Sequence, residues 1–517
     1  MNLPRLFRNQ ALPCAITLSL LAASSASAAN KTWDGGGGAD ISWTTGANWN
    51  ANTAPIPSAD ALRFQGTSVA NNNAFAAGTI FEKIDFRATN IVSSAAFDLV
   101  GNSVTLNTGS PITTSVMTNG TLTDKISLDL SLSDVSPTIT TGTAHNLNIA
   151  GVISGATQAL KKEGAATLTL SGVNTFSGKM VVTAGTLELT EARALQNSPL
   201  DALTSITGDA ANGLKITTTN LTLGGLRGST TNDLTPVRAL ASLFTTTSGG
   251  YASLTELTLN NIANTDYTYN QVIANGAAGM SLIKTGAGTQ IFGVDAAHTY
   301  SGVTTVSQGS LIINGNQSSA TGALTVASGA TLGGSGTIGG ATTISGIHSP
   351  GNSPGVQTFN NGLTYSNGST FVWELTGNTS TNSDRGTAFD GVNVSGGTLT
   401  INGGVTNNLV FNGVGSTVNW SDAFWASNQE WLVFSNASLP TLASINVFET
   451  INVGVDSLTN SLTSVRSGSS FSWDTIDDDV YLTYAIPEPS TCALLALLGA
   501  GFAGRALVRR RRRHGVD

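Results

Sequence analysis

Short runs of alternating apolar and polar residues, separated by glycine or asparagine, occupy most of this chain. Residues 167–170 read TLTL and residues 186–189 read TLEL, and turn-forming residues lie on either side of each run. An alternation with a period of two places the apolar side chains on one face of a strand and Thr or Ser on the other. The pattern therefore predicts many short strands, each with one buried and one hydrated face, and almost no helix.

Two segments of this strand-rich body repeat one another. They are LKKEGAATLTLSGVNTFSGKMVVTAGTLEL at residues 160–189 and LIKTGAGTQIFGVDAAHTYSGVTTVSQGSLII at residues 282–313. Lys162 and Gly164 of the first copy correspond to Lys284 and Gly286 of the second. Repeated units of short strands and turn glycines favour stacked coils, so we predict an all-β right-handed parallel β-helix, or β-solenoid, over residues 30–385. A β-sandwich is the alternative fold.

The repeat resembles the autotransporter-associated β-strand repeat of passenger domains. The first copy departs from that motif at Ala166 and Phe176, and the second replaces the TLTL run by TQIF. The segment from Gly322 to Phe359, which includes SPGNSPG, resembles the stretch that follows such repeats. The opening of the body, from Thr32 to Asn50 with its three tryptophans, is also similar to exported members of this group. The resemblance implies a passenger-type β-helix.

The region that follows, residues 386–485, is less regular but still β-like. It contains GTLTI at 397–401 and VYLTYA at 480–485. Three tryptophans cluster there: Trp420, Trp425 and Trp431. Aromatic side chains form carbohydrate-stacking platforms, but an open solenoid end exposes apolar strand edges, so we interpret this region as a β-rich C-terminal cap.

The N-terminus has the three parts of a secretory signal peptide. Arg5 and Arg8 precede an apolar stretch, and a run of small residues containing the A-x-A site at Ala26 to Ala28 follows it. We therefore predict a signal peptide over residues 1–29, with cleavage after Ala28 or Ala29.

The C-terminus, residues 486–513, reads as a short membrane segment with a cytoplasmic basic end. An apolar run extends from Cys492 to Gly504 and is shorter than the roughly 17–25 residues of a comfortable membrane span. A cluster of arginines follows it, and such clusters stay on the cytoplasmic side of a membrane. The predicted element is a short transmembrane sorting helix that holds the exported body in the inner membrane.

The sequence IPEPS, the apolar segment and the arginine cluster together resemble the PEP-CTERM sorting tail of Gram-negative bacteria. Ile486 stands where the family usually has Val. The resemblance implies recognition by an exosortase, which removes the tail, in bacteria that make exopolysaccharide. The residues that would carry this sorting signal are Pro487, Glu488, Pro489, Arg509, Arg510, Arg511, Arg512 and Arg513.

The composition of the chain excludes several classes of partner and of site chemistry. The chain has 59 glycines, is 10% charged, and contains 31 acidic against 23 basic residues, several of which lie in the two terminal segments. An acidic body argues against nucleic-acid binding, which requires a basic surface. The two cysteines, Cys14 and Cys492, also lie in the terminal segments. The mature body would therefore have no disulfide, thiol nucleophile or zinc-thiolate site.

The sequence offers little catalytic chemistry. The acids of the repeats are isolated, and the one tight cluster, Asp477 to Asp479 with Asp474 before it, lacks calcium-loop spacing, so we interpret it as a solvated turn. The four histidines are scattered without metal-ligand spacing, and we expect each at the surface. Glycine-rich stretches at 35–40 and 333–336 lack the context of a phosphate loop. We therefore predict no catalytic, cofactor-binding or metal site.

The sequence favours an exported structural or adhesive protein of the cell surface or extracellular matrix. Its expected partners are an exosortase, exopolysaccharide or neighbouring cells, and, through the tail, the inner membrane. Because parallel β-helices include many lyases and hydrolases, a secreted polysaccharide-degrading enzyme is the alternative. A passive surface spacer without a ligand is a third.

Overall fold

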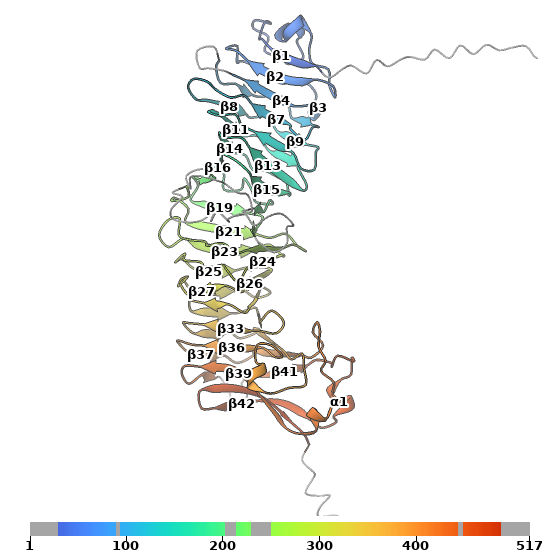
Figure 1. The fold of residues 1–517 in the computed structure, drawn as a ribbon, viewed down its shortest axis with the longest axis vertical. Coiled ribbons are helices and arrows are strands. Elements are labelled where there is room, and N and C mark those ends of the chain that lie inside the picture. The colour runs from blue at the N-terminus through green and yellow to red at the C-terminus, as the bar shows by residue number, and fades with distance from the viewer. Residues whose placement is uncertain (1–28, 89–93, 202–212, 229–249, 443–447, 488–517) are drawn as a thin grey trace, which may run out of the picture.

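The protein is a long stack of short β-strands that follow one another from the N-terminal to the C-terminal end (Figure 1). This computed structural model describes residues 29–88, 94–201, 213–228, 250–442 and 448–487. Helix in these residues is confined to short pieces, so the prediction of an all-β, almost helix-free solenoid is confirmed. The pieces are η1 (Gly46–Asn48), η2 (Asn50–Asn52), η3 (Asn382–Asp384), η4 (Ala423–Ala426) and α1 (Leu462–Val465).

Three parallel sheets form the N-terminal half of the stack. Sheet 1 contains β1 (Asn30–Trp33), β2 (Ala61–Gln65), β4 (Ile84–Arg87), β7 (Ile112–Thr114), β10 (Thr138–Thr140), β13 (Ala159–Glu163), β15 (Lys179–Val182), β17 (Leu200–Asp201) and β20 (Leu226–Arg227). Sheet 2 contains β5 (Asp98–Leu99), β8 (Leu122–Ile126), β11 (His145–Ile149), β14 (Thr167–Leu170), β16 (Thr186–Leu189) and β18 (Leu214–Ile216). Sheet 3 contains β3 (Thr79–Phe81), β6 (Val104–Leu106), β9 (Leu130–Leu132) and β12 (Ile153–Gly155).

Three further sheets form the C-terminal half. Sheet 4 contains β19 (Asn220–Leu223), β21 (Glu256–Asn260), β23 (Ser281–Thr285), β25 (Thr304–Val306), β28 (Leu324–Val326), β31 (Thr342–Ile344), β34 (Leu363–Tyr365), β37 (Leu399–Ile401) and β40 (Thr441–Leu442). Sheet 5 contains β22 (Asp266–Tyr269), β24 (Thr289–Phe292), β26 (Ser310–Ile313), β29 (Thr331–Gly334), β32 (Ile347–Pro350), β35 (Thr370–Glu374), β38 (Thr406–Val410) and β41 (Thr450–Val453). Sheet 6 contains β27 (Asn316–Gln317), β30 (Thr337–Ile338), β33 (Val356–Phe359), β36 (Gly391–Val394), β39 (Gln429–Asn436), β43 (Asp479–Ala485) and β42 (Ser470–Ile476).

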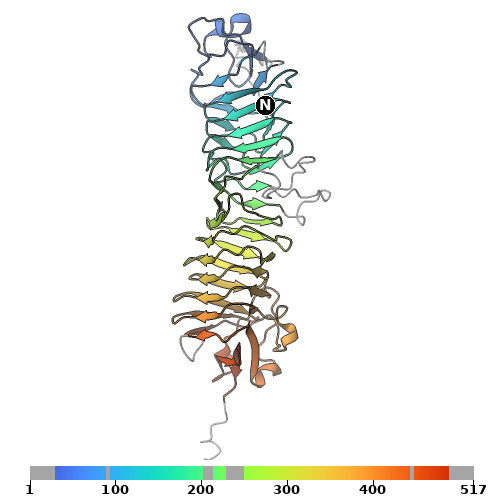
Figure 2. The ribbon, with the colours of Figure 1, turned by 90° about the vertical axis from the view of Figure 1, so that its left-hand side faces the viewer.

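The alternating sequence pattern explains how each coil joins the next. Leu168 in β14 is fully buried and pairs in parallel register with Leu147 of the preceding coil and Leu187 of the following one. Burying a leucine side chain stabilises a fold by about 1.5–3 kcal/mol. Because buried side chains stack in this way from coil to coil, one continuous apolar core runs from Trp33 to Tyr484, between strands that are seen one above another in Figure 2.

The repeated glycines occupy corners that no other residue fits. Gly164 has a φ of +80°, and a Cβ atom on it would lie 1.8 Å from the carbonyl oxygen of Thr141 in the coil below. Gly286, its counterpart in the second repeat, has a φ of +71° and a similarly close contact with the carbonyl oxygen of Asn261. Positive φ and close backbone approach both require glycine, which is why these positions recur in the two repeats.

A tryptophan cluster closes the N-terminal end, a role that the sequence did not reveal. Trp33, Trp43 and Trp49 are almost completely buried and meet edge to face, with ring centroids 5.2 Å apart for the first and third and 6.3 Å apart for the second and third. The residues of η1 and η2 cross the outer edge of β1, where the backbone N–H of Thr32 donates to Asn50. The first strand is therefore covered, and its edge is not free to pair with another chain.

The C-terminal end is closed by a second aromatic cluster, as predicted. Parallel pairing continues past residue 385 as far as β41. There the hairpin of β42 and β43 pairs antiparallel to β39. Trp420, Trp425 and Trp431 are fully buried beneath it, and Trp420 meets Trp425 edge to face at 4.6 Å between ring centroids. Capping of the core by the three tryptophans is confirmed.

The two terminal segments lie almost wholly outside the described residues. Residues 1–28 of the predicted signal peptide and residues 488–517, which contain the apolar run and the arginine cluster, are among those not described. None of the helices in the described residues has the length and hydrophobicity that a membrane span requires.

Candidate functional site

The lysine of the first repeat is a buried structural donor. Lys162 lies at an inward-facing position of β13 and is fully buried. Its Nζ donates to the carbonyl oxygens of Glu163 at 2.9 Å, Gly164 at 2.7 Å and Ala184 at 3.0 Å. The last of these belongs to the next coil, so the ammonium links two corners of the solenoid. Burial lowers the pKa of Lys162 to about 8.

The lysine of the second repeat has the same surroundings. Lys284 in β23 is fully buried, and its Nζ donates to the carbonyl oxygens of Thr285 at 2.7 Å, Gly286 at 2.8 Å and Gln308 at 3.1 Å. Burial also lowers the pKa of Lys284 to about 8. The recurrence of this lysine in both repeats therefore has a structural explanation.

The prediction that the histidines lie at the surface is wrong for three of them. His145, His298 and His348 have no exposed area, and His514 lies outside the described residues. Each of the three takes an inward-facing position of its coil, where its ring packs in the core. Their scattered positions in the sequence concealed this shared orientation.

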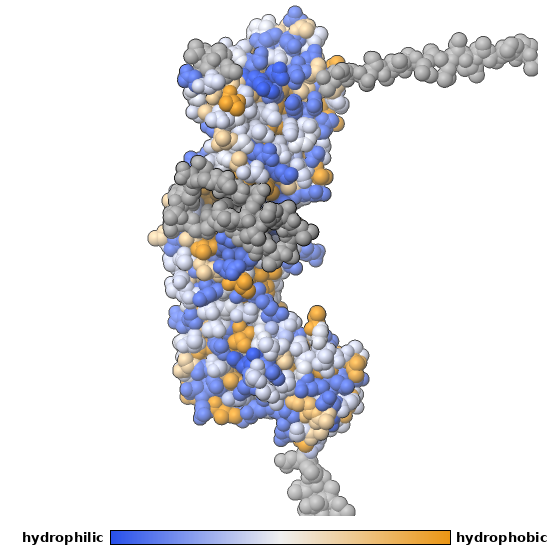
Figure 3. All heavy atoms as spheres, in the orientation of Figure 1, coloured by the Kyte–Doolittle hydropathy of each residue, from blue (hydrophilic) through white to orange (hydrophobic). Residues whose placement is uncertain are grey.

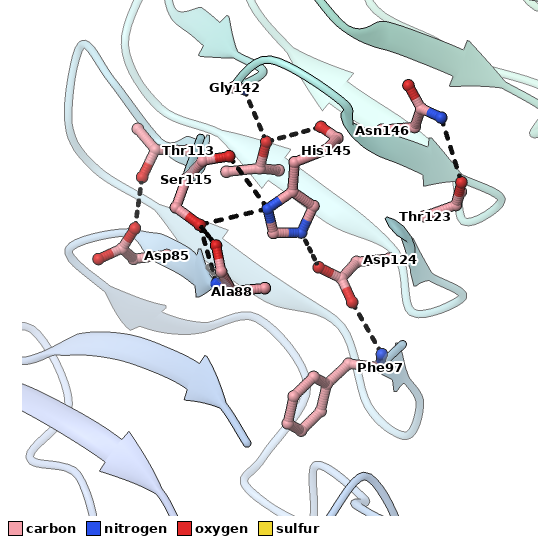
Figure 4. Close-up of polar contacts among 11 residues, drawn as sticks. Asp85, Ala88, Phe97, Thr113, Ser115, Thr123, Asp124, Gly142, His145 and Asn146 are labelled. Carbon is pink, nitrogen blue, oxygen red and sulfur yellow. Dashed lines mark hydrogen bonds and ion pairs between the residues drawn. The ribbon is translucent and has the colours of Figure 1, made fainter. Parts of the chain in front are cut away.

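The surroundings of His145 contain a serine and an aspartate, as in a hydrolase triad (Figure 4). The Nε2 atom of His145 lies 2.6 Å from Oδ2 of Asp124. The Nδ1 atom lies 3.1 Å from the carbonyl oxygen of Ser115 and 3.3 Å from its Oγ. The Asp124 carboxylate also accepts the backbone N–H of Phe97 at 2.8 Å.

These hydrogen bonds do not form a nucleophile and a base. The Ser115 hydroxyl donates to the carbonyl oxygen of Ala88 at 2.5 Å and accepts the N–H of the same residue at 2.8 Å. The Nδ1 atom of His145 lies closer to the Ser115 carbonyl oxygen than to the Ser115 hydroxyl, which is already bonded to the backbone of Ala88. The cluster instead ties together three successive coils.

The other two buried histidines differ in their partners. His348 lies between the Tyr365 hydroxyl, 2.5 Å from Nδ1, and Oε1 of Gln357, 2.8 Å from Nε2. His298 accepts the backbone N–H of Ile273 at 3.1 Å through Nδ1. Burial lowers the pKa of His348 to about 4 and that of His298 to about 3, because the charged form is poorly solvated there.

Two carboxylates border a pocket of about 340 Å³ beside the SPGNSPG loop. Asp390 accepts the backbone N–H groups of Gly355 at 2.9 Å and Glu374 at 3.0 Å, and Glu374 accepts the Ser353 hydroxyl at 2.7 Å. Burial, together with the nearby Glu374 charge, raises the pKa of Asp390 well above its usual range. Because both oxygens of Asp390 are bonded to the backbone, its geometry suits fastening the loop to β35 better than proton transfer.

The acidic cluster near the C-terminus forms the turn of a hairpin, as predicted. Asp477 and Asp478 are exposed between β42 and β43, and Asp479 accepts the backbone N–H of Asn436 at 2.8 Å. No group of three or more potential metal-binding side chains occurs among the described residues.

Of the predicted processing residues, the structure describes only the innermost ones. Ala29 donates its backbone N–H to Oδ1 of Asp60 at 3.2 Å. At the other end, β43 finishes at Ala485 and the N–H of Ile486 donates to Asn428 at 3.0 Å. Pro487 is the last described residue. Ala28, Glu488, Pro489 and Arg509 to Arg513 lie outside the described part of the chain.

Comparison with known protein families finds matches for the two repeats and for the C-terminal tail. Residues 160–189 and 282–313 match the passenger-associated transport repeat family, and residues 485–513 match the PEP-CTERM protein-sorting motif. The resemblances inferred from the sequence for the two repeats and for the C-terminal tail are thereby confirmed.

A curated relative is the adhesin BmaC autotransporter of Brucella suis biovar 1 (strain 1330). It is 36% identical to this chain over 183 residues. The match covers 34% of this chain and 5% of that protein, so the similarity concerns a small part of a much longer adhesin.

Proposed function

We propose that this protein is an exported structural or adhesive component of the cell surface or extracellular matrix. The observation that carries the proposal is that a capped, passenger-type solenoid ends within two residues of the Pro487 to Pro489 sorting motif. The motif therefore begins directly after the last strand of the folded body, where the proposed membrane enzyme would act. The similarity to an adhesin supports the adhesive role.

The proposed route begins with signal-peptide removal. A cut after Ala28 makes Ala29 the new N-terminus, and its ammonium then faces Asp60, whose side chain is almost fully buried. A charge-assisted bond of this kind is stronger than the neutral one it replaces. A cut after Ala29 removes the donor. We therefore favour the bond after Ala28 among the two predicted sites.

The second part of the route uses the C-terminal tail. Cys492 to Gly504 would hold the body at the inner membrane while Arg509 to Arg513 stay on the cytoplasmic side, since moving five charges through hydrocarbon is prohibitive. An exosortase would then read Pro487, Glu488 and Pro489 and release the body outward, to associate with exopolysaccharide or neighbouring cells.

We also propose that the body is not an enzyme. The polar groups that resemble catalytic sets, around His145 and around Asp390, are bonded to backbone groups, mostly of neighbouring coils. A polysaccharide-degrading enzyme was the alternative inferred from the fold. Release of reducing sugar from a polysaccharide panel by the purified protein would support that alternative.

The proposal is tested by locating the protein and its ends. Intact cells are treated with a protease that does not enter them, and the protein that remains is followed by immunoblot, with a cytoplasmic protein as control. Mass spectrometry of the terminal peptides is expected to find a mature chain that begins at Ala29. A chain that is protected from the protease and retains Met1 would exclude export.

A further inference from the structure

Sheet 4 carries a regular column of threonines on its outer face. The column begins at Thr222 in β19 and ends at Thr441 in β40, and parallel register places one residue of every strand in it. Ile283 in β23 is its single departure from threonine. Neighbouring strands lie about 4.8 Å apart, so the eight steps of this threonine column span about 38 Å.

The hydroxyls of the column have no partner within the described protein. All eight threonine side chains are half-buried or exposed. None of them makes a hydrogen bond to another described residue. A hydroxyl that faces water can exchange that water for a ligand oxygen at little cost. The column therefore presents a line of donors and acceptors to the outside.

The N-terminal half of the stack provides the contrast. Along the outer face of sheet 2, Lys125 pairs with Asp98 at 3.1 Å, and Lys215 pairs with Glu188 at 2.6 Å. Thr169, in the same column, donates to Glu188 at 3.1 Å. These side chains satisfy one another from coil to coil. Free hydroxyls in register are thus not a property of every outer face of the solenoid. Sheet 5 has a second such column, interrupted by Ile347, and sheet 4 has the more uniform one.

The small number of charged residues on sheet 4 indicates which kinds of ligand this face can bind. The strands of sheet 4 contain two charged residues, Glu256 and Lys284, and the second points into the core. A surface without cations does not attract nucleic acid or an anionic polymer. Ile283 is the one apolar side chain in the column, whereas protein interfaces depend on a central apolar or aromatic cluster. The ligand class that fits this column of hydroxyls is therefore a neutral, hydroxyl-rich polymer.

We propose that the threonine column binds a neutral polysaccharide chain that lies along the axis of the solenoid. Each contact is weak, so affinity comes from many aligned contacts with a repetitive ligand. Serines widen the array: Ser307, Ser345 and Ser366 follow two residues after three of the threonines and so share their face. This inference deepens the adhesive function proposed above, because it names the face and the chemical class of its ligand.

The test compares two sets of threonine-to-valine changes in the full-length protein recovered from producing cells. Valine has the shape and strand preference of threonine but no hydroxyl. The first variant changes four consecutive members of the column, Thr305→Val, Thr325→Val, Thr343→Val and Thr364→Val. The control changes four outward threonines of sheets 2 and 3, Thr105→Val, Thr123→Val, Thr167→Val and Thr186→Val. Thermal unfolding verifies that both variants are folded.

The probes are insoluble cellulose, an insoluble neutral (1→3)-β-glucan, and alginate as an anionic polymer. The wild type and the control variant should sediment with at least one neutral glucan at both low and high salt, and the column variant should lose about tenfold or more of that affinity. Binding of the wild type to alginate alone, binding unchanged in the column variant, or no binding to either glucan would overturn the proposal.

Two other outcomes would assign the column to another partner and equally overturn it. One is wild-type self-association, seen by light scattering, that the column variant loses while glucan binding is absent. The other is retention on ice with the same dependence on the column. Neither result bears on export, which is measured separately by the protease treatment of intact cells, so failure of this inference is distinct from failure of the proposed function.

Discussion

Lys162 and Lys284 occupy the same place in two different coils. Each ammonium is fully buried and donates to three carbonyl oxygens, two in the corner just after it and one in the following coil. A lysine in this position therefore links two glycine-containing corners by hydrogen bonds to their backbone carbonyl groups.

Replacing Lys162 with methionine is expected to lower the free energy of unfolding by about 2 kcal/mol, because three carbonyl oxygens lose their donor. Urea unfolding measures the change. Lys161→Met is the matched control: Lys161 is half-exposed and should change stability by no more than about 0.5 kcal/mol. Equal effects of the two changes, or a more stable Lys162→Met variant, would show that the buried ammonium does not hold the corners.

Acid is expected to destabilise the body through His298 and His348. Their pKa values are about 3 and about 4 in the folded protein, below the ordinary histidine value of 6.5 that applies to the unfolded chain. The unfolded chain therefore binds protons first as the pH falls, so stability is complete above about pH 6.5 and is lost progressively as the pH falls through 4.

For His348 the loss amounts to about 3 kcal/mol once the pH lies below its folded pKa. His348→Gln removes this titration. The variant should be less stable than the wild type at pH 7 but should show a shallower decline in melting temperature toward pH 4. Parallel declines in the two proteins would argue that His348 does not contribute to acid sensitivity.

The C-terminal cap is tested at Trp425, whose indole N–H donates to Asn378 at 2.9 Å. Trp425→Ala should destabilise the hairpin end by about 3–5 kcal/mol, since it leaves a cavity and an unpaired acceptor. Limited proteolysis is expected to cut near β42 and β43 first, and light scattering should detect aggregation through the uncovered strands. Leu439→Ala, at a residue that is 67% exposed, should leave both measurements unchanged.

The cluster around His145 is expected to support folding and not catalysis. Asp124→Ala removes the carboxylate that bonds both the buried ring and the backbone N–H of Phe97, and should cost about 3 kcal/mol. Ser115→Ala should cost about 1 kcal/mol and should leave the background hydrolysis of an activated ester unchanged. A measurable esterase rate in the wild type that Ser115→Ala abolishes would restore the catalytic interpretation.

Local pattern was sufficient to predict the solenoid. Runs such as Thr167–Leu170 and Thr186–Leu189 determine both the strands and the direction in which each side chain points, and the repeated glycines mark the corners. The three C-terminal tryptophans were likewise recognisable as a cap. The equivalent role of Trp33, Trp43 and Trp49 was missed, because the sequence shows their spacing but not that their loop folds over the first strand.

Contacts between coils were not predictable in this way. Asp124 precedes His145 by 21 residues, about one coil, and lies inward in β8 as His145 does in β11. Only the stacking register brings the two together. A signal was nevertheless present: both residues, like Lys162, take the inward phase of their alternating strands. A polar residue in that phase is a candidate for a buried, bonded group.

The claim that the C-terminal motif sorts the protein is tested most directly by changing that motif and locating the protein in the cell. Cells producing the wild type, the double variant Pro487→Ala and Glu488→Ala, or the control Asp474→Ala, which alters an exposed residue of β42, are separated into membrane and surface fractions and compared by immunoblot and mass spectrometry. We predict that the wild type and the control reach the surface without residues 492–513, while the double variant stays in the membrane fraction with its tail intact. A double variant that reaches the surface at the size and level of the wild type would contradict the claim that this motif sorts the protein.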